Sequence, residues 1–483
     1  MTTMRTHSKK AIRLFAVIAA LSMSACKDLV IPDYNNTSVD DLSNNPTPTK
    51  ITQASQGLLV GTRVGIGEQN GYISLLGILG RESYNFDPAD PRFVTEMLVG
   101  PLDGGSPAFG GNLWSNPYRN IRNASLELAA LNKVPLVNDA EKESIRGFAQ
   151  TIQALDYLNV INTRDANGAP IVSDLDPLAP PAAIASKDSV FGHIGRLLDS
   201  AQAHLDSAGV LTTGGDLPFP FALSPGFGGF TSTVSFRQFN RALRARVLVY
   251  RGSSGCTTCW DSALTALTGS FIDTLADFNV GVFYSYATVS GDETNPLFDP
   301  NARALVAHPS FQTDAQLQAG GAPDDRFVRK TATLASPKTT QGLSSQIQYT
   351  IYKSNTDPIP IIRNEELILI RAEANIGKGG AALAAAVADL NLVRIKSGKL
   401  PAYAGAVTQA ALLDELLYNR RYSLAFEGGH RWIDLRRYGR LATLPTETTS
   451  SGAAKRFAKF PFPQFDCDAR STKPAGCGTE AGF

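Results

Sequence analysis

The segment Asn419–Arg440 reads NRRYSLAFEGGHRWIDLRRYGR, and it decides the fold expected for the chain. Aromatic residues recur every four positions at Tyr418, Tyr422 and Phe426, which places them on one face of a helix. This helix is expected over Thr408–Phe426, with Thr408 as its cap. The pair Gly428-Gly429 is expected to end it, because glycine readily adopts positive backbone angles.

Charged residues are dense in the same segment. Glu427 and Asp434 lie among the arginines Arg420, Arg421, Arg431, Arg436 and Arg437. This pattern favours an ion-pair cluster that clamps the turn against neighbouring helices. The alternative is a pair of catalytic carboxylates of the kind that glycoside hydrolases use. Nearby arginines lower carboxyl pKa values, which suits salt bridging and weakens a general acid.

Upstream segments extend the pattern. They are Ile361–Glu366 (IIRNEE), Ile370–Ala374 (IRAEA) and Asp389–Arg394 (DLNLVR). Together with Asn419–Arg440, this region resembles the characteristic C-terminal part of the SusD/RagB family, over about Pro360–Leu441. Asn419 and Ser423 stand where the family tends to carry glutamates, and Gly429 looks like a one-residue insertion relative to the family pattern. The ion pairs around these positions are therefore expected to differ from those of the family.

The resemblance implies both a fold and a function. It implies a mainly α-helical protein, a SusD-like α/α superhelix, and a substrate-binding lipoprotein of the outer membrane. Such a protein captures oligosaccharides, or in some branches peptides, and acts as the lid of a SusC-like TonB-dependent transporter barrel. It also implies that the chain is not an enzyme and needs no cofactor.

Helical periodicity agrees with this fold. Apolar residues recur at three- and four-residue intervals over Lys50–Val64, Ser74–Arg81, Trp114–Leu131, Ala140–Asn162, Val190–Ser207, Ser235–Tyr250, Glu365–Ile376 and Ala381–Ser397. Gly377 and Gly398 are expected to stop helices. The pattern predicts stacked helix pairs that resemble tetratricopeptide repeats, joined by long irregular loops and a few short strands, one of them within Ser345–Lys353.

The N-terminal segment is typical of a lipoprotein signal peptide, assigned to residues 1–25. Arg5, Lys9, Lys10 and Arg13 precede an apolar core, Leu14–Met23, which is followed by Ser24-Ala25-Cys26. The small residues and the thiol predict cleavage and acylation at Cys26; an ordinary signal peptide is the alternative. Acyl chains would anchor the protein to the outer membrane, and Lys27-Asp28 favours the face at the cell surface.

The predicted domains follow from this start. Residues 26–50 are rich in polar residues and predict a lipid anchor with a flexible tether. Residues 51–483 show no further composition shift and predict one SusD/RagB-like helical domain. The formal net charge of +1 excludes an electrostatic footprint for nucleic acid.

Four cysteines remain besides Cys26. Two local disulfides, Cys256–Cys259 and Cys467–Cys477, are the economical pairing in an oxidising envelope, although three connectivities are formally possible. A zinc site or a redox motif at Cys256 and Cys259 is the alternative.

Candidate ligand contacts lie in the long loops. A sugar site needs aromatic rings for the pyranose faces and planar polar groups for the hydroxyls. Two clusters meet this need: Tyr84, Asn85, Phe86, Arg92 and Phe93; and Phe283, Tyr284, Tyr286, Asn295 and Phe298. Each ring has core packing as its alternative. Calcium is a further alternative at Asp292, Glu293, Asn295 and Asp299.

Two other functions stay open at this stage. One is an envelope enzyme, such as an all-helical glycoside hydrolase working through Glu427 and Asp434. The other is a scaffold that binds proteins through its helix pairs. The sequence lacks a serine nucleophile elbow, a phosphate loop, a dinucleotide fingerprint and an HExxH helix, which disfavours the enzyme.

Overall fold

The computed structural model describes residues 39–135, 137–172, 175–176 and 178–483. The chain divides into a unit of residues 1–38 and a unit of residues 39–483. The predicted signal peptide and Cys26 lie outside the described residues.

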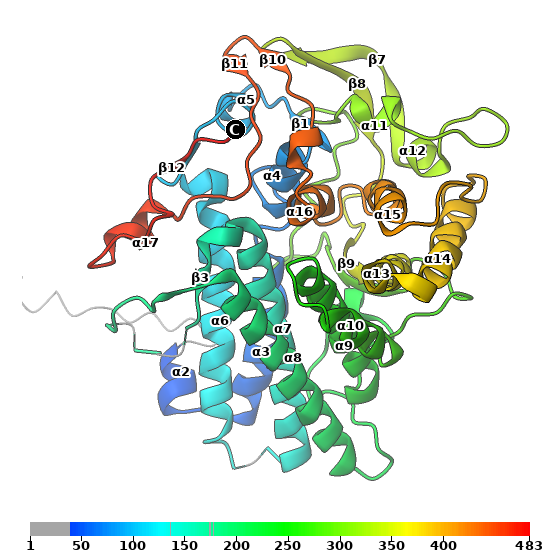
Figure 1. The fold of residues 1–483 in the computed structure, drawn as a ribbon. Helices are drawn as coiled ribbons and strands as arrows, with labels where there is room; N and C mark the ends of the chain where they lie inside the picture. The colour runs from blue at the N-terminus through cyan, green and yellow to red at the C-terminus, as the bar shows by residue number, and fades with distance from the viewer. Residues whose placement is uncertain (1–38, 136, 173–174, 177) are drawn as a thin grey trace, which may run out of the picture. The chain divides into compact units, whose positions relative to one another are not determined.

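Helices dominate the described part of the chain, which confirms the predicted fold class (Figure 1). They are α2 Val39–Asn44, α3 Pro48–Arg63, α4 Tyr72–Leu79, α5 Arg92–Thr95, α6 Asn112–Leu131, α7 Asp139–Arg164, α8 Lys187–Val210, α9 Thr233–Gly252, α10 Cys259–Thr268, α11 Ser310–Thr313, α12 Asp325–Lys330, α13 Asn364–Lys378, α14 Leu383–Lys396, α15 Gln409–Ser423, α16 His430–Arg437 and α17 Gln464–Asp468. Short helical turns are η1 Pro107–Gly111, η2 Asp165–Asn167, η3 Pro225–Phe227, η4 Gly380–Ala382 and η5 Leu441–Thr443.

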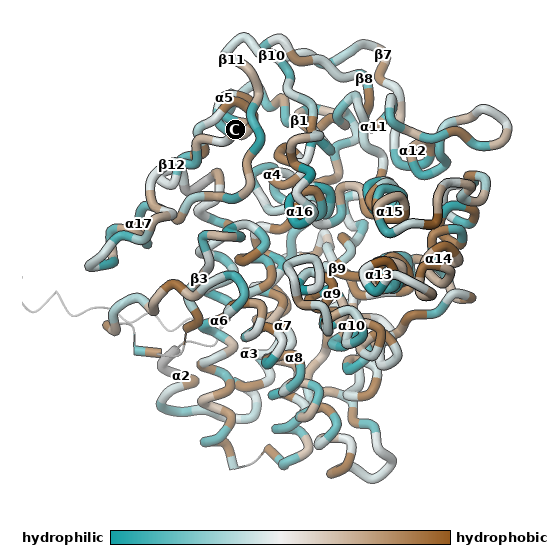
Figure 2. Tube along the Cα trace, viewed as in Figure 1, coloured by the Kyte–Doolittle hydropathy of each residue, from teal (hydrophilic) through white to brown (hydrophobic). Residues whose placement is uncertain are grey.

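The long helices pack in succession. α6 packs on α3 and α7, α7 on α8, α8 on α9, and α9 on α10 and α13. α13 then contacts α14 and α15, and α15 contacts α16. This order forms the stacked arrangement that runs through Figure 1. Hydrophobic and hydrophilic residues alternate along α6–α9, so each helix presents an apolar side to its neighbours (Figure 2).

The strands form antiparallel pairs and no larger sheet within the described residues. The pairs are β1 Ser83–Asn85 with β6 Leu305–Ala307, β2 Leu102–Asp103 with β12 Thr479–Glu480, β3 Ala169–Pro170 with β4 Ile184–Ala185, β5 Gly281–Tyr284 with β9 Ile359–Arg363, β7 Thr331–Thr340 with β8 Leu343–Tyr349, and β10 Thr448–Thr449 with β11 Gly452–Ala453. The strand predicted within Ser345–Lys353 is therefore present as part of β8.

The packed body begins earlier than the predicted boundary at residue 51. α2 packs on α6 and buries Leu42, and α3 starts at Pro48 behind the cap Thr47. The Asn- and Pro-rich composition of this stretch reflects helix caps and starts, which polar residues also serve. The predicted tether is correspondingly shorter.

Gly377 does not stop a helix, contrary to the prediction. α13 continues to Lys378 and ends at Gly379, whose φ is 71°. Position 377 requires a glycine because the Trp260 ring packs directly against it; an added Cβ would lie 2.3 Å from that ring. The glycine thus serves a close helix contact between α10 and α13.

The aromatic face predicted over Thr408–Phe426 is only partly correct. Thr408 caps α15 as predicted, and the Tyr418 and Tyr422 rings lie 4.7 Å apart. The helix ends at Ser423, however, and Phe426 has a φ of 58° and stacks on Tyr349 at 4.8 Å. The wide turn between α15 and α16 carries Phe426 away from the helix face.

Both predicted disulfides are present, Cys256–Cys259 and Cys467–Cys477. With both thiols of Cys256 and Cys259 in one bond, neither is free to bind zinc. A redox motif forms the same bond in its oxidised state, so the bond does not separate a structural role from a redox role. A search of the described helices finds none with the length and apolarity needed to cross a membrane.

Candidate functional site

Strand β5 places one aromatic ring outside the core. Val282 and Tyr284 are buried, whereas Phe283 between them is half-buried. Successive side chains of a strand point to opposite faces, so Phe283 faces away from the side that its neighbours fill. The register with β9 shifts between Val282 and Phe283, an irregularity of the kind that redirects a side chain.

A glycine-rich turn lies directly against this strand. The turn reads Pro225-Gly226-Phe227-Gly228-Gly229-Phe230, and a Cβ on Gly226 would lie 2.0 Å from the Phe283 carbonyl oxygen. Only glycine permits this approach. Phe227 is buried against Phe239, with ring centroids 5.6 Å apart, and this contact holds the turn in place.

We name the cavity beside Phe283 the aromatic groove. It has a volume of about 680 Å³, within the range of about 300–1,000 Å³ of small-molecule sites. Its aromatic lining comprises Phe230, Phe271, Phe283 and Tyr286, and its polar lining includes Gln238, Asn279, Ser285, Asp292 and Thr356. Rings and planar polar groups therefore converge on one space.

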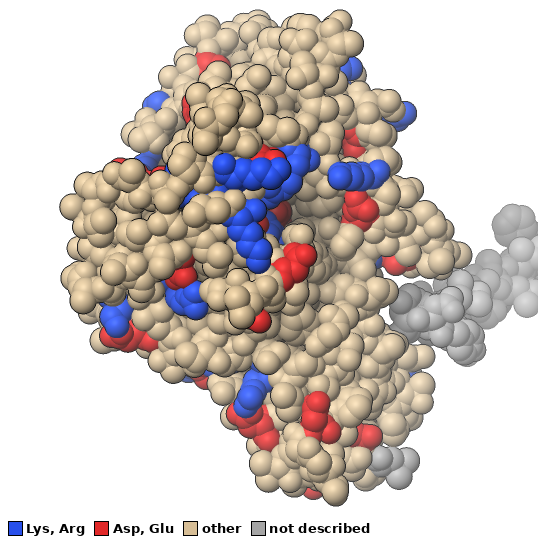
Figure 3. Space-filling model, turned by 90° about the vertical axis from the view of Figure 1, so that its right-hand side faces the viewer, with Lys and Arg blue, Asp and Glu red and all other residues tan. Residues whose placement is uncertain are grey.

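A second cavity, the basic compartment, adjoins the groove. It has a volume of about 570 Å³ and shares Asn279, Phe283 and Pro358 with the groove. Its basic lining comprises Arg329, Lys330, Lys353, Arg363 and Lys396. Figure 3 shows Lys and Arg side chains gathered around a hollow on one face of the molecule. Phe283 stands at the junction of the two cavities.

The first predicted ligand cluster lies largely in the core. Tyr84 and Phe86 are 3% and 8% exposed and stack on each other at 5.2 Å. Phe93 is buried against Phe109, and buried Asn85 accepts a hydrogen bond from the Asp87 N–H. Arg92 is exposed and pairs with Asp90 at 2.7 Å. The structure thus gives this cluster packing roles, because β1 joins β6 and draws the rings inward.

The second cluster is divided. Tyr286 lines the aromatic groove, with the Arg63 guanidinium 5.1 Å from its ring centroid. Tyr284 and Asn295 are buried, and the Asn295 amide donates to the Asp357 carbonyl at 2.8 Å. Phe298 is half-buried against the core. Ligand contact stays a prediction for Tyr286.

The predicted calcium ligands have other partners. Arg63 pairs with Asp292 at 2.5 Å and with Glu293 at 3.0 Å. The Asn295 side-chain amide oxygen accepts from the Leu297 N–H, and the Asp299 carboxylate accepts from the Ala304 N–H. Within the described residues, no group of three or more His, Cys, Asp or Glu side chains is arranged to hold a metal ion.

Glu427 and Asp434 belong to separate ion pairs, as the interpretation of an ion-pair cluster predicts. Glu427 accepts from Arg363 at 2.9 and 3.0 Å, and Asp434 accepts from Arg420 at 2.6 Å. Arg437 also pairs with Asp434 at 2.9 Å. Burial alone would raise the pKa of Asp434, but Arg420 and Arg437 hold it below its usual value. This arrangement suits structure and opposes proton donation.

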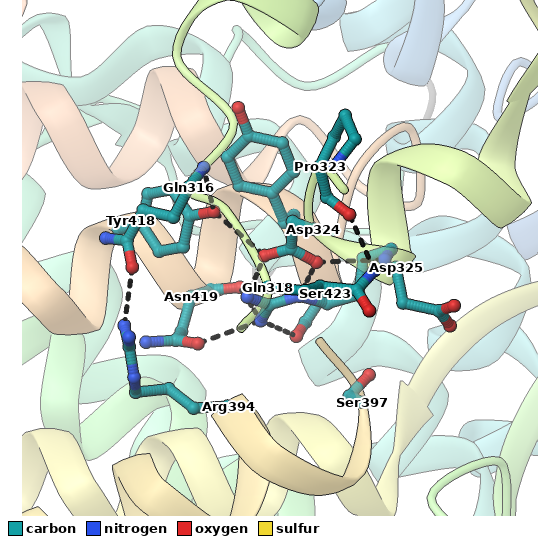
Figure 4. Close-up of polar contacts among 12 residues, drawn as sticks. Gln316, Gln318, Pro323, Asp324, Asp325, Arg394, Ser397, Tyr418, Asn419 and Ser423 are labelled. Atoms are coloured by element: carbon teal, nitrogen blue, oxygen red, sulfur yellow. Dashed lines mark hydrogen bonds and ion pairs between the residues drawn. The ribbon is translucent and has the colours of Figure 1, made fainter. Parts of the chain in front are cut away.

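The predicted rewiring at Asn419 and Ser423 centres on Arg326. Arg326 is fully buried and donates to the Asn419 amide oxygen at 2.8 Å and to the Ser423 hydroxyl at 3.0 Å. Figure 4 shows Asp324, Asn419 and Ser423 gathered in this cluster. Its counter-charge is Asp324, two residues earlier, at 2.9 Å and 2.5 Å. Tyr418 donates to the same carboxylate at 2.8 Å. Asp324 at the start of α12 therefore supplies the negative charge that a glutamate at position 419 or 423 of α15 would otherwise provide.

Glu82 is a buried acid without an ion-pair partner in the described residues. It is 1% exposed and accepts a hydrogen bond from the Phe426 N–H at 3.4 Å. Burial raises the pKa of Glu82 to about 8, so this carboxyl keeps its proton at neutral pH.

Sequence reasoning missed several residues of the two cavities. Phe230 and Phe271 line the groove, and Lys353 and Lys396 line the compartment, yet none was predicted. The glycine-rich run Pro225–Phe230 was a usable signal, because alternating Gly and Phe is typical of a turn that packs closely. The lysines carried no local signal, since distant segments bring them together.

Comparison with known proteins confirms the resemblance. The profile of the SusD family matches residues 310–473. Surface glycan-binding protein A from Bacteroides thetaiotaomicron, solved with laminarihexaose, is 14% identical over 90% of this chain and 100% of its own, with a TM-score of 0.65. A SusD-like protein from Bacteroides fragilis is 13% identical over 92% and 99%, with a TM-score of 0.64. A laminarin-binding SusD-like protein is 16% identical over 90% and 100%, with a TM-score of 0.57. The curated proteins yield no match.

The Arg326–Asp324 pair gives a stability prediction. Asp324→Asn keeps the shape of the side chain but leaves the buried Arg326 charge unpaired, so unfolding free energy should fall by about 3–5 kcal/mol. Urea unfolding followed by circular dichroism measures this. The matched control is Asp206→Asn, which breaks an exposed pair with Arg237 and should cost about 0–1 kcal/mol. Equal losses in the two variants would contradict the role given to Asp324.

Glu82 gives a prediction about pH. Its pKa of about 8 in the folded protein exceeds the usual glutamate pKa of 4.5, so the stability from its bound proton is full below pH 4.5 and is lost as pH rises through 8. Between about pH 6 and pH 9 the wild type should lose on the order of 2 kcal/mol more than Glu82→Gln, which cannot ionise. Chemical denaturation at both pH values measures the gap. A gap that does not change with pH would refute the assignment.

Proposed function

We propose that this chain, SusD-like in its fold and in residues 310–473, is a carbohydrate-binding lipoprotein of the outer membrane. It captures oligosaccharides at the cell surface and delivers them to a SusC-like TonB-dependent transporter, for which it acts as the lid. The aromatic groove at Phe283 is the observation that carries this proposal.

The groove has the chemistry that a sugar requires. A pyranose ring has an apolar face that stacks on an aromatic ring, and its edge carries hydroxyls that need planar hydrogen-bonding groups. Phe283 supplies a half-exposed ring, and Gln238, Asn279 and Asp292 supply amide and carboxylate groups in the same cavity. A solved protein with this fold holds laminarihexaose, which supports a glycan ligand.

The role in binding is separate from catalysis. Glu427 lines the basic compartment, but both of its carboxylate oxygens accept from Arg363. A carboxylate whose two oxygens both accept from one guanidinium is committed to that ion pair and is not free to act on a ligand. The ligand is therefore expected to leave the site unchanged.

The N-terminal sequence supports the anchor. Basic residues, the apolar stretch Leu14–Met23 and small residues precede Cys26, the order of a lipoprotein signal. Lys27-Asp28 and the polar stretch that begins at Pro32 follow Cys26, and this composition supports a tether between the anchor and the packed body.

Phe283→Ala tests the groove. Loss of the stacking face should weaken oligosaccharide binding about tenfold, without loss of folded protein, because the ring is half-exposed. A glycan array followed by calorimetry with the best ligand measures this. The control is Phe465→Ala, which removes a ring that is 53% exposed on α17, outside the groove. Binding unaffected by Phe283→Ala would count against the site.

Cys26→Ser tests the anchor and the partner in one preparation. The wild-type chain should incorporate labelled palmitate, sediment with outer membrane and copurify in detergent with a large barrel protein. The variant should lose the label and leave the membrane fraction. A wild-type chain that is unlabelled, or that runs alone after solubilisation, would contradict the proposal.

A further inference from the structure

The basic compartment contains two kinds of positive charge. Lys330 and Arg363 are 8% and 4% exposed and form its inner wall. Arg329, Lys353 and Lys396 are exposed and form its outer part. The two groups differ in whether protein acids neutralise them.

The inner charges are neutralised by the protein itself. Arg363 pairs with Glu427 at 2.9 Å and with Glu365, and it donates to the Ser423 carbonyl at 2.5 Å. Lys330 donates to the Tyr422 and Ser423 carbonyls and lies 3.4 Å from Glu427. Lys330 and Arg363 therefore both have protein acceptors, and Glu365 and Glu427 neutralise their charge, so neither cation is left to pair with a ligand.

The outer lysines lack such neutralisation. Neither Lys353 nor Lys396 forms an ion pair with any residue that the structure describes. The Lys396 ammonium donates to the Ala276 carbonyl at 3.0 Å and lies 4.5 Å from the centroid of the Phe278 ring. Arg329 is shared between Asp325 at 3.0 Å and the Ser397 hydroxyl at 2.8 Å. The ammonium groups of Lys353 and Lys396 therefore keep hydrogen-bond donors that an anion can use.

Two acids face the same cavity, and their oxygens are partly committed. Asp357 accepts from the Ser354 hydroxyl at 2.7 Å and from the N–H groups of Lys353 and Ser354. Burial alone would raise the pKa of Asp357, but these hydrogen bonds and the nearby Lys353 charge lower it, so the group is an occupied acceptor. Asp277 is exposed and accepts from the Asn279 N–H at 2.8 Å. Arg329 is already paired with Asp325, so Lys353 and Lys396 are the outer cations without an ion pair among the described residues, and the two acids that face them are occupied as acceptors.

We propose that the basic compartment binds the acidic group of an anionic oligosaccharide. A sugar ring stacks on Phe283 in the aromatic groove, and the carboxylate or sulfate of that ring or its neighbour lies between Lys353 and Lys396. Because Phe283 lines both cavities, one short chain of sugars reaches both. The inference rests on the proposed function and names its substrate class.

Matched ligands separate charge from shape. Oligogalacturonides and their methyl esters share the same rings and differ only in charge, and a sulfated oligosaccharide with its desulfated form gives the second pair. Calorimetry measures each ligand with the wild-type protein, Lys353→Gln, Lys396→Gln, Phe283→Ala and the control Lys378→Gln. Lys378 pairs with Asp261 at the far end of α13, outside both cavities.

One acidic ligand should bind at least tenfold more tightly than its neutral partner. Each of Lys353→Gln and Lys396→Gln should weaken that ligand about fivefold and leave the neutral one unchanged, while Lys378→Gln affects neither. Raising salt from about 0.05 to 0.5 M should weaken only the acidic ligand. The pair that shows the difference, uronate or sulfate, identifies the acidic group.

Three results would overturn the inference, and they are distinguishable. If acidic and neutral sugars bind equally and only Phe283→Ala weakens them, the groove functions and the compartment does not select charge. If no sugar binds, the proposed function fails with the inference. Binding of an acidic peptide such as hexaglutamate in a lysine-dependent manner, without sugar binding, would assign the compartment to peptides instead.

Discussion

The buried guanidinium of Arg363 is the interaction on which the rest of the structure depends. It lies at the end of β9 and joins the start of α13, through Glu365, to the turn after α15, through Glu427. A buried charge costs several kcal/mol unless it is paired, so these segments have to meet for the fold to tolerate it. α13 in turn packs on α9, α10, α14 and α15, which links the stacked helices to this one charge.

The same network forms one wall of the basic compartment. Glu365 and Glu427 are needed to neutralise Arg363, so they are unavailable to a ligand. Burial alone would raise the pKa of Glu365, but Arg363 and Lys330 keep it well below its usual value. The wall is therefore committed to the fold, and the exposed Lys353 and Lys396 are the cations of this cavity that form no ion pair among the described residues.

Local patterns in the sequence were sufficient for the helices and for the ion-pair cluster. Helix periodicity, the Thr408 cap and the arginines around Asp434 are all patterns among residues close together in the sequence. Gly377 was misread because the residue that requires a glycine there is the distant Trp260. The burial of Tyr84 could not be foreseen, because its strand pairs with one more than two hundred residues away. The two cavities join segments around residues 226, 283, 353 and 396, and no local pattern predicts that meeting.

Side chains alternate between the two faces of β5, so neighbouring residues of this strand serve different purposes: core packing on one face and the cavities on the other. Val282 and Tyr284 are committed to the interior, whereas Phe283 touches solvent and the cavities. If the groove binds sugars as proposed, a change at residue 283 alters the ligand contact at little expense to folding, while a change one position away disturbs the core. Diversification of ligand preference among chains of this shape can then proceed by single substitutions on an unchanged scaffold. Gly226 has to remain a glycine in such variants, because it contacts the backbone of residue 283 whatever side chain that residue carries.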